Sequence, residues 1–234
     1  MQTKYKGILI YTKVYKDNDL LIKFLSDTDE IISGIVYGGL SRRKKNLLQL
    51  GFFLNFYLST KSNRPPSINV ELCEPYISKI IDDKYKLNCL MTITSLINLS
   101  IIEGQKINNI FNICDNFLLK MINNKRWLIE FLIFLFNLLK IIGYEIEYSN
   151  NTKYKYFDLE LLEFTKFQNK SSVSFPFSLL NNENNKIETQ SLNTIFEIFE
   201  TVFSKYHLYN FNLRLPNQYH LFKKLIIQTL NKNE

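Results

Sequence analysis

Hydrophobic and polar residues alternate with a period of two through most of the first third of the chain. Such alternation over short runs is typical of half-buried β-strands. The acidic stretches Asp17-Asn18-Asp19 and Asp27-Thr28-Asp29-Glu30 provide turns between the runs. The pattern predicts five short strands, near residues 8–15, 20–25, 31–37, 52–59 and 68–72. Because an open sheet would leave hydrophobic edges exposed, we predict a five-stranded OB-fold barrel, although an SH3-like barrel would give a similar pattern.

From residue 84 onward the hydrophobic period changes to that of amphipathic helices. The run 127–142 is apolar nearly all round, which predicts the central helix of a bundle with Gly143 as its C-terminal cap. Further helical stripes lie in residues 84–102, 107–121 and 192–206, and after Pro216. The predicted fold class is therefore α+β, with a barrel domain over residues 1–78 followed by an α-helical domain over residues 79–234.

Residues 144–187 interrupt the helical pattern and predict a small irregular insert. Within it, residues 154–167 and 173–177 have the character of a hairpin, and residues 168–172 would form its turn.

Basic residues are concentrated near the N-terminus. The chain has 234 residues and a net charge of +7; residues 1–80 hold 12 Lys+Arg against 7 Asp+Glu, and the remainder holds 17 against 15. The densest group is Arg42-Arg43-Lys44-Lys45, which follows Gly38-Gly39. Four adjacent cations repel one another and cannot be buried, so they predict a solvated loop that faces water or an anionic partner.

The sequence indicates the compartment as well. No apolar signal core follows the N-terminal Met, and the apolar run 127–142 is too short and too often interrupted by polar residues to span a bilayer. The cysteines are odd in number and widely spaced, at Cys73, Cys89 and Cys114. We therefore expect a cytoplasmic protein with no membrane segment, disulfide framework, cofactor or structural metal.

Signs of catalysis are weak. His207 and His220 are the only histidines, and the chain has no GxSxG, phosphate-binding P-loop or GxGxxG motif. The acidic residues of the first 30 positions lie in predicted turns, where Asp serves local hydrogen bonding. We expect no catalytic residues, and a nuclease that uses these acids is the least favoured hypothesis.

Nucleic acid is the anionic partner that this pattern favours. A single-strand groove combines cations along the backbone with aromatic faces on which bases stack. Tyr11, Tyr15 and Tyr37 lie between or beside the cations, although packing in the barrel explains each ring better than base stacking does. The candidate DNA contacts are Arg42, Arg43, Lys44, Lys45, Lys13, Lys23 and Lys61.

Several motifs resemble one known family. The run from Tyr15 to Arg43 reads YKDNDLLIKFLSDTDEIISGIVYGGLSRR, and residues 38–51 read GGLSRRKKNLLQLG, close to a GGxSRRxRxxLQPG loop. Residues 138–144, LLKIIGY, resemble an LLxxLGY/F motif, and Leu215-Pro216 precedes an amphipathic helix. In order and spacing these motifs resemble the RecO family of bacterial recombination mediators.

The resemblance implies an OB-fold that binds single- and double-stranded DNA and anneals complementary strands. It also implies that the protein works with RecR to load recombinase on gaps coated by single-strand-binding protein. By position, Arg42, Arg43, Lys44 and Lys45 correspond to the DNA-contacting loop. A generic single-stranded DNA- or RNA-binding module without mediator activity is the alternative.

The chain departs from the family pattern at several places, among them Leu40 and Leu50, which replace a frequent Arg and Pro. Many relatives carry a four-cysteine zinc site in the insert, whereas residues 144–187 contain no cysteine, so we predict no zinc. Where the family often has Arg-Phe-Glu, this chain has Ile133-Phe134-Leu135, which puts a contact with the acidic tail of single-strand-binding protein in doubt. Lys125, Arg126 or Lys140 would have to replace that arginine in the contact with the acidic tail.

Overall fold

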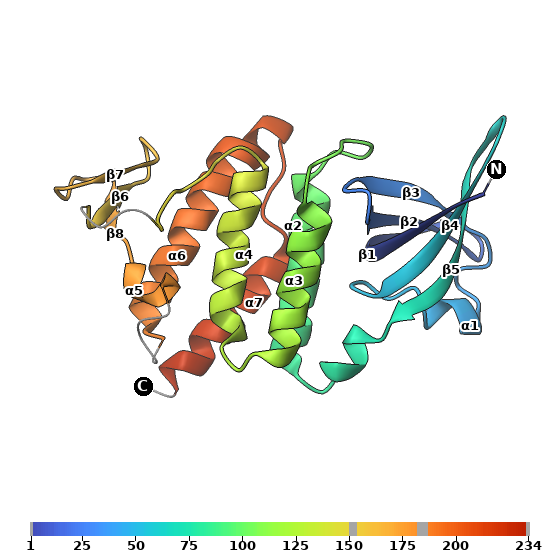
Figure 1. The fold of residues 1–234 in the computed structure, drawn as a ribbon, viewed down its shortest axis with the longest axis horizontal. Helices are drawn as coiled ribbons and strands as arrows, with labels where there is room; N and C mark the ends of the chain where they lie inside the picture. Colours follow the sequence, from blue (N-terminus) through green and yellow to red (C-terminus); the bar gives the residue numbers. More distant parts are fainter. Residues whose placement is uncertain (1, 150–153, 182–186, 233–234) are drawn as a thin grey trace. The chain divides into compact units, whose positions relative to one another are not determined.

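The computed structural model describes residues 2–149, 154–181 and 187–232. The chain divides into two compact units, residues 1–122 and 123–234. The first unit holds a β-barrel and two long helices, and the second holds the other long helices and a small sheet (Figure 1). The domain boundary predicted between residues 78 and 79 lies where the chain changes from strands to helices. The boundary between the two compact units lies further on, after Ile122.

The barrel of the first unit is closed. Its strands are β1 (Gln2–Lys16), β2 (Asp19–Ser26), β3 (Ile31–Val36), β4 (Phe53–Lys61) and β5 (Arg64–Glu74), in the order β1-β2-β3-β5-β4. Closure depends on the length of β1, because residues 2–8 pair with β4 and residues 7–16 pair with β2. Strands β3 and β5 pair in parallel, and the other pairs are antiparallel. The prediction of a five-stranded barrel followed by helices is confirmed.

Gly7 lies where β1 pairs with both neighbouring strands. A Cβ atom at this position would lie 2.7 Å from the carbonyl oxygen of Leu25 and 2.7 Å from the ring of Phe24. Only glycine allows this close approach. Beside it, the rings of Phe24 and Phe56 stack with centroids 3.8 Å apart and fill the barrel interior.

Two helices complete the first unit, α2 (Lys84–Ser100) and α3 (Ile110–Asn123). Helix α2 begins after Asp83, whose carboxylate accepts hydrogen bonds from the backbone N–H groups of Tyr85 and Lys86. Such a side-chain cap satisfies donors that have no partner inside the helix. Both helices were predicted, with ends that differ by a few residues.

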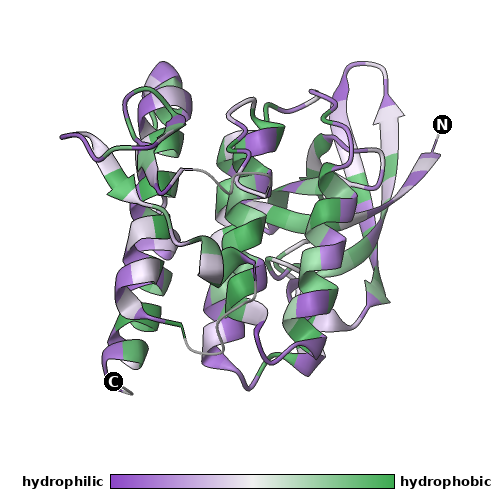
Figure 2. Ribbon diagram, turned by 60° about the vertical axis from the view of Figure 1, so that its left-hand side comes forward, coloured by the Kyte–Doolittle hydropathy of each residue, from purple (hydrophilic) through white to green (hydrophobic). Residues whose placement is uncertain are grey.

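The second unit is built on α4 (Trp127–Ile141), and Gly143, two residues after its last residue, has φ +94°. Helices α6 (Thr189–Val202) and α7 (Asn217–Asn231) pack with it, and the rings of Phe131 and Phe222 meet edge to face at 4.9 Å. Figure 2 shows helices with hydrophobic residues on one side and hydrophilic residues on the other. Within residues 2–149, 154–181 and 187–232, no helix has both the length and the hydrophobicity that a membrane crossing requires.

The insert differs from its prediction. It forms a three-stranded sheet of β6 (Tyr156–Asp158), β7 (Glu163–Thr165) and β8 (Ser172–Ser174), in the order β7-β6-β8, followed by the short helix α5 (Phe177–Leu180). The carboxylate of Asp158 accepts hydrogen bonds from the backbone N–H groups of Glu160 and Leu161. This turn divides the run predicted as one arm of a hairpin into two strands. The two-stranded prediction was therefore wrong.

Candidate nucleic-acid interface

The basic residues Arg42–Lys45 form a short helix, α1, between β3 and β4. The backbone N–H of Lys45 donates to the carbonyl oxygen of Ser41 at 2.9 Å, and that of Leu48 donates to the carbonyl oxygen of Lys44 at 3.0 Å. These bonds are those of a helical turn. The expectation of a solvated loop was therefore wrong in its local geometry, because backbone hydrogen bonding continues through the four cations.

The turn between β1 and β2 holds the start of this segment. The backbone N–H of Gly38 donates to Oδ1 of Asp19 at 2.7 Å, and the N–H of Leu40 donates to the carbonyl oxygen of Asn18 at 2.9 Å. Gly38 has φ +62° with open space around it, so its backbone conformation is what requires glycine. The two bonds tie α1 to the end of the β1–β2 hairpin.

The side chains of α1 are mostly available to solvent. Arg42, Arg43 and Lys45 are exposed, and Lys44 is half-buried because its Nζ donates to the carbonyl oxygen of Tyr37 at 2.7 Å. Among the described residues, no carboxylate forms an ion pair with any of these four cations. The four charges are therefore left to solvent or to an anionic ligand.

The β1–β2 hairpin, whose turn holds the start of α1, carries further cations. Lys13 is exposed and pairs in register with Leu21, and the exposed Lys16 pairs with Asp19. Asp19 is also the residue that holds Gly38, so Lys16 and the start of α1 lie beside the same turn. Lys16 was absent from the predicted site, because only the strand register places it there.

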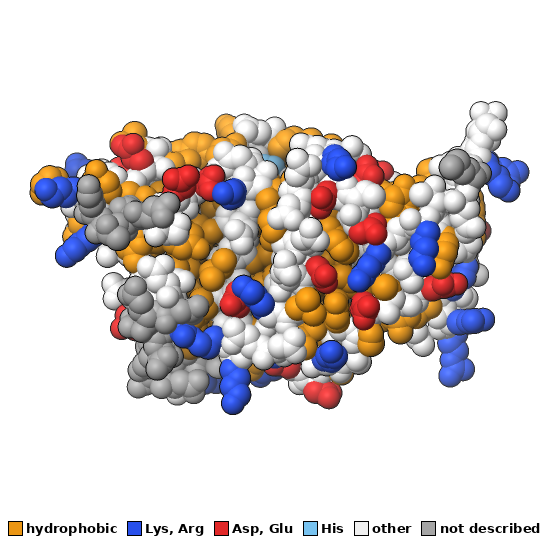
Figure 3. All heavy atoms as spheres, viewed as in Figure 1, with side chains coloured by type: hydrophobic (Ala, Val, Ile, Leu, Met, Phe, Trp, Pro, Cys, Tyr) orange, Lys and Arg blue, Asp and Glu red, His pale blue; other side chains and the backbone are white. Residues whose placement is uncertain are grey.

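Two exposed tyrosines accompany these cations. Tyr15 is 45% exposed and precedes Lys16, and Tyr37 is 50% exposed and precedes Gly38. We call the whole surface the basic end, which consists of Lys13, Tyr15, Lys16, Tyr37 and Arg42–Lys45. Figure 3 shows basic side chains that protrude where α1 lies in Figure 1. Cations beside exposed aromatic faces are the combination that single-stranded nucleic acid requires.

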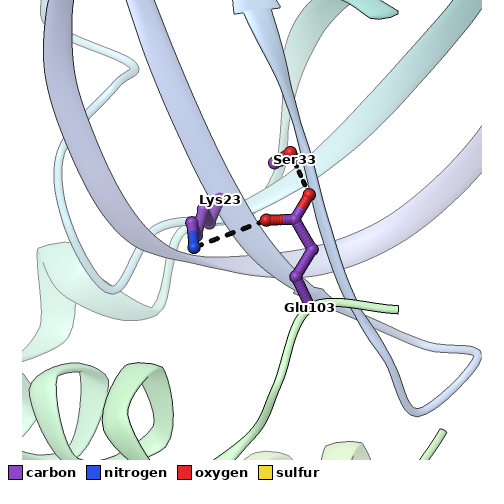
Figure 4. Close-up of polar contacts among 3 residues, drawn as sticks. All are labelled: Lys23, Ser33 and Glu103. Atoms are coloured by element: carbon purple, nitrogen blue, oxygen red, sulfur yellow. Dashed lines mark hydrogen bonds and ion pairs between the residues drawn. The ribbon is translucent and has the colours of Figure 1, made fainter. Parts of the chain in front are cut away.

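Lys23 is engaged elsewhere. Its Nζ lies 3.4 Å from a carboxylate oxygen of Glu103, which also accepts a hydrogen bond from the hydroxyl of Ser33 (Figure 4). The same ammonium lies 5.9 Å from the ring centroid of Tyr11. Glu103 would compete with a DNA phosphate for the ammonium group of Lys23. Its assignment as a DNA contact stays a prediction.

Lys61 lies apart from the basic end. It pairs with Arg64 across the turn between β4 and β5, and both side chains are exposed. This turn lies next to the first residues of β1, since Gln2 pairs with Ser59, whereas α1 is tied to the turn that follows the last residues of β1. Of the seven predicted residues, the structure thus brings together the four of α1, and Lys13 lies on the hairpin whose turn holds them.

The described residues offer little for catalysis. Burial raises the pKa of the Cys89 and Cys114 thiols, which keeps both of them protonated and unreactive. Within the described part of the chain, no three His, Cys, Asp or Glu side chains are grouped as metal ligands. The expectation that the protein is not an enzyme stays a prediction.

Residues 1–76 match the family model described as Recombination protein O N terminal. The barrel belongs to the RecO family. The matched residues cover all five strands and the basic end, so the barrel is a RecO-type OB-fold, which supports a role in DNA repair and recombination. A comparison with curated proteins gave no significant match.

Proposed function

We propose that this RecO-family protein is a non-enzymatic recombination mediator that anneals complementary single strands of DNA. One observation carries the proposal: the RecO-type barrel presents four cations on α1, and hydrogen bonds to Asn18 and Asp19 hold that helix. Lys and Arg that contact phosphates release counterions from DNA, which supplies affinity without dependence on sequence. Contacts of this kind suit both single-stranded and double-stranded DNA.

Annealing follows from the same charges. Two complementary strands repel each other through their phosphates, and a surface that neutralises phosphates lowers this repulsion. The basic end carries six cations within two short segments of the chain, Lys13, Lys16 and Arg42–Lys45. A strand held along this surface therefore meets its complement at a lower electrostatic cost.

The proposal extends to protein partners on the strength of the family resemblance. RecR and single-strand-binding protein are the partners proposed, and the protein would help load recombinase on gaps coated by the latter. Of the residues considered for the acidic tail, Lys140 is engaged by Glu145 in an ion pair, which raises the pKa of Lys140. Lys125 is exposed and is the better candidate for that contact.

A second function has one observation in its favour. The family match covers residues 1–76, which are the barrel of the first unit and not its helices. A generic module that binds single-stranded DNA or RNA, without mediator activity, would need only the barrel. Annealing separates the two functions.

The test is annealing of complementary oligonucleotides coated with the cognate single-strand-binding protein. We expect the wild type to anneal them and the variant with Arg42, Arg43, Lys44 and Lys45 changed to Ala to lose this activity. The matched control changes Lys61 and Arg64 to Ala, which removes exposed cations away from the basic end. Binding without annealing by the wild type would support the generic module, and metal-dependent cleavage would support an enzyme.

A further inference from the structure

An apolar groove of about 680 Å³ opens beside the basic end. Its walls are the segment that follows α1, the 3-10 turn Tyr76–Lys79 with the residues after it, and α2. The apolar lining includes Phe52, Ile81, Leu87 and Met91, and the polar lining includes Asn46 and Gln49. The volume falls within the range of ~300–1,000 Å³ that is usual for ligand clefts.

The groove is continuous with the four cations of α1. Asn46 lines the groove and directly follows Lys45, and the Nε2 of Gln49 donates to the carbonyl oxygen of Lys45 at 2.8 Å. The N–H of Leu48, another lining residue, donates to the carbonyl oxygen of Lys44. A ligand that enters the groove therefore passes the end of a cationic helix, which favours an anionic chain.

The walls of the groove are held in place by close packing. Gly51 has φ +80°, and a Cβ atom there would lie 2.6 Å from the side chain of Leu90 on α2. The N–H of Gly51 donates to the carbonyl oxygen of Leu9 at 2.7 Å. The segment between α1 and β4 is thus fixed against both β1 and α2, so the groove exists before any ligand arrives.

We propose that this groove takes unpaired bases of a single DNA strand whose phosphates contact α1. The proposal rests on the proposed DNA-binding function. A nucleobase has flat apolar faces and polar edges, and the groove offers the half-buried ring of Phe52 with the amides of Asn46 and Gln49. Amide side chains both donate and accept hydrogen bonds, as base edges do. Stacking on aromatic and apolar walls tolerates every base, which suits a protein that acts on any sequence.

The test compares two oligonucleotides of the same length and charge, one of thymidylate and one with abasic deoxyribose at every position. Fluorescence anisotropy at several salt concentrations measures the affinity of each. We expect the wild type to prefer the thymidylate strand by about tenfold, the scale of one stacked base. We expect both strands to show the same salt dependence, because their phosphates are the same.

Two groove variants, Ile81→Ser and Met91→Gln, are expected to lose most of this preference and to keep the salt dependence. Ile81 is 59% exposed, so its substitution leaves the packed core intact. The matched control is Ile102→Ser, because Ile102 is 58% exposed in the same unit and outside the groove. We expect this control to keep the preference.

Equal affinity of the wild type for the two strands overturns the inference, and so does an unchanged preference in both groove variants. In either case a normal salt dependence would leave the proposed DNA binding intact. Absence of binding to both strands would instead remove the proposed function, and the inference with it. A further outcome is that the groove variants leave DNA affinity unchanged but weaken the binding of a peptide. That result would assign the groove to a protein partner and overturn the inference.

Discussion

The carboxylate of Asp29, in the turn between β2 and β3, accepts a hydrogen bond of 3.0 Å from the backbone N–H of Phe111, 82 residues further along the chain. Its other oxygen accepts from the N–H of Asn109 at 2.9 Å. Asp29 has φ +66°, and its own carbonyl oxygen accepts from the N–H of Ile107. One residue of the barrel thus caps α3, where a negative charge is favoured by the helix dipole.

Asp29→Ala should therefore destabilise the first unit by about 1–2 kcal/mol, the usual cost of removing a helix N-terminal cap. Asp29→Asn should cost less, because an amide oxygen still accepts a hydrogen bond. Urea unfolding curves of the three proteins measure the difference. Equal losses for both variants would show that charge, and not the hydrogen bonds, is the main contribution.

The salt dependence of DNA binding tests α1. Changing Arg42, Arg43, Lys44 and Lys45 to Ala should lower the slope of log affinity against log salt by about 3, at ~0.7 per phosphate contact on single strands. The Lys61→Ala/Arg64→Ala variant should lower it less, since this pair lies apart from the basic end. An unchanged slope in the α1 variant would contradict the assignment of the basic end.

Asp19 should position α1 by its hydrogen bond and not by its charge. Asp19→Ala removes the acceptor for the N–H of Gly38, whereas Asp19→Asn keeps an acceptor oxygen and makes the same change in net charge. We expect Asp19→Asn to bind DNA more tightly than Asp19→Ala. Anisotropy titrations at one salt concentration measure the ratio, and a ratio of one would argue that α1 holds its place without Asp19.

Removal of the ion pair between Lys23 and Glu103 should show whether DNA contacts Lys23. Glu103→Gln removes the carboxylate that pairs with Lys23, an interaction of ~0–1 kcal/mol at a partly exposed site. If phosphates reach Lys23, the salt slope should rise by ~0.7 and affinity should increase. Glu145→Gln is the matched control, because it frees Lys140 in the other unit by the same change of charge. Equal effects of the two variants would indicate a general charge effect.

The insert should lose stability in acid. Hydrogen bonds from the backbone N–H of Leu161, from Asn169, from the N–H of Glu160 and from Ser171 lower the pKa of Asp158 to about 2. Because the folded pKa lies below the unfolded value of ~3.9, this contribution to stability is present above pH ~4 and is lost as the pH falls to about 2. Amide exchange of β6–β8 against pH measures it. Asp158→Asn should remove the pH dependence.

Local patterns in the sequence were sufficient for the elements of the fold. Alternation and turn residues predicted five strands, and the change of period at residue 84 predicted the helices, because burial of one face constrains which positions are apolar. Gly143 was predicted as a helix end and has the positive φ that this role requires. The insert was predicted less well, because the divided run depends on a side-chain hydrogen bond of Asp158 that periodicity does not register.

The candidate site was only partly contained in the sequence. The charge of the run Arg42–Lys45 was enough to predict an exposed basic segment, since four adjacent cations cannot be buried. Only the tertiary structure decided which other cations join it: register adds Lys16, the ion pair with Glu103 engages Lys23, and the closure of the barrel sets Lys61 apart. The physical reason is that hydrophobicity and charge are properties of single positions, whereas a surface depends on hydrogen bonds between residues far apart in the chain, such as that of Asp19 with Gly38.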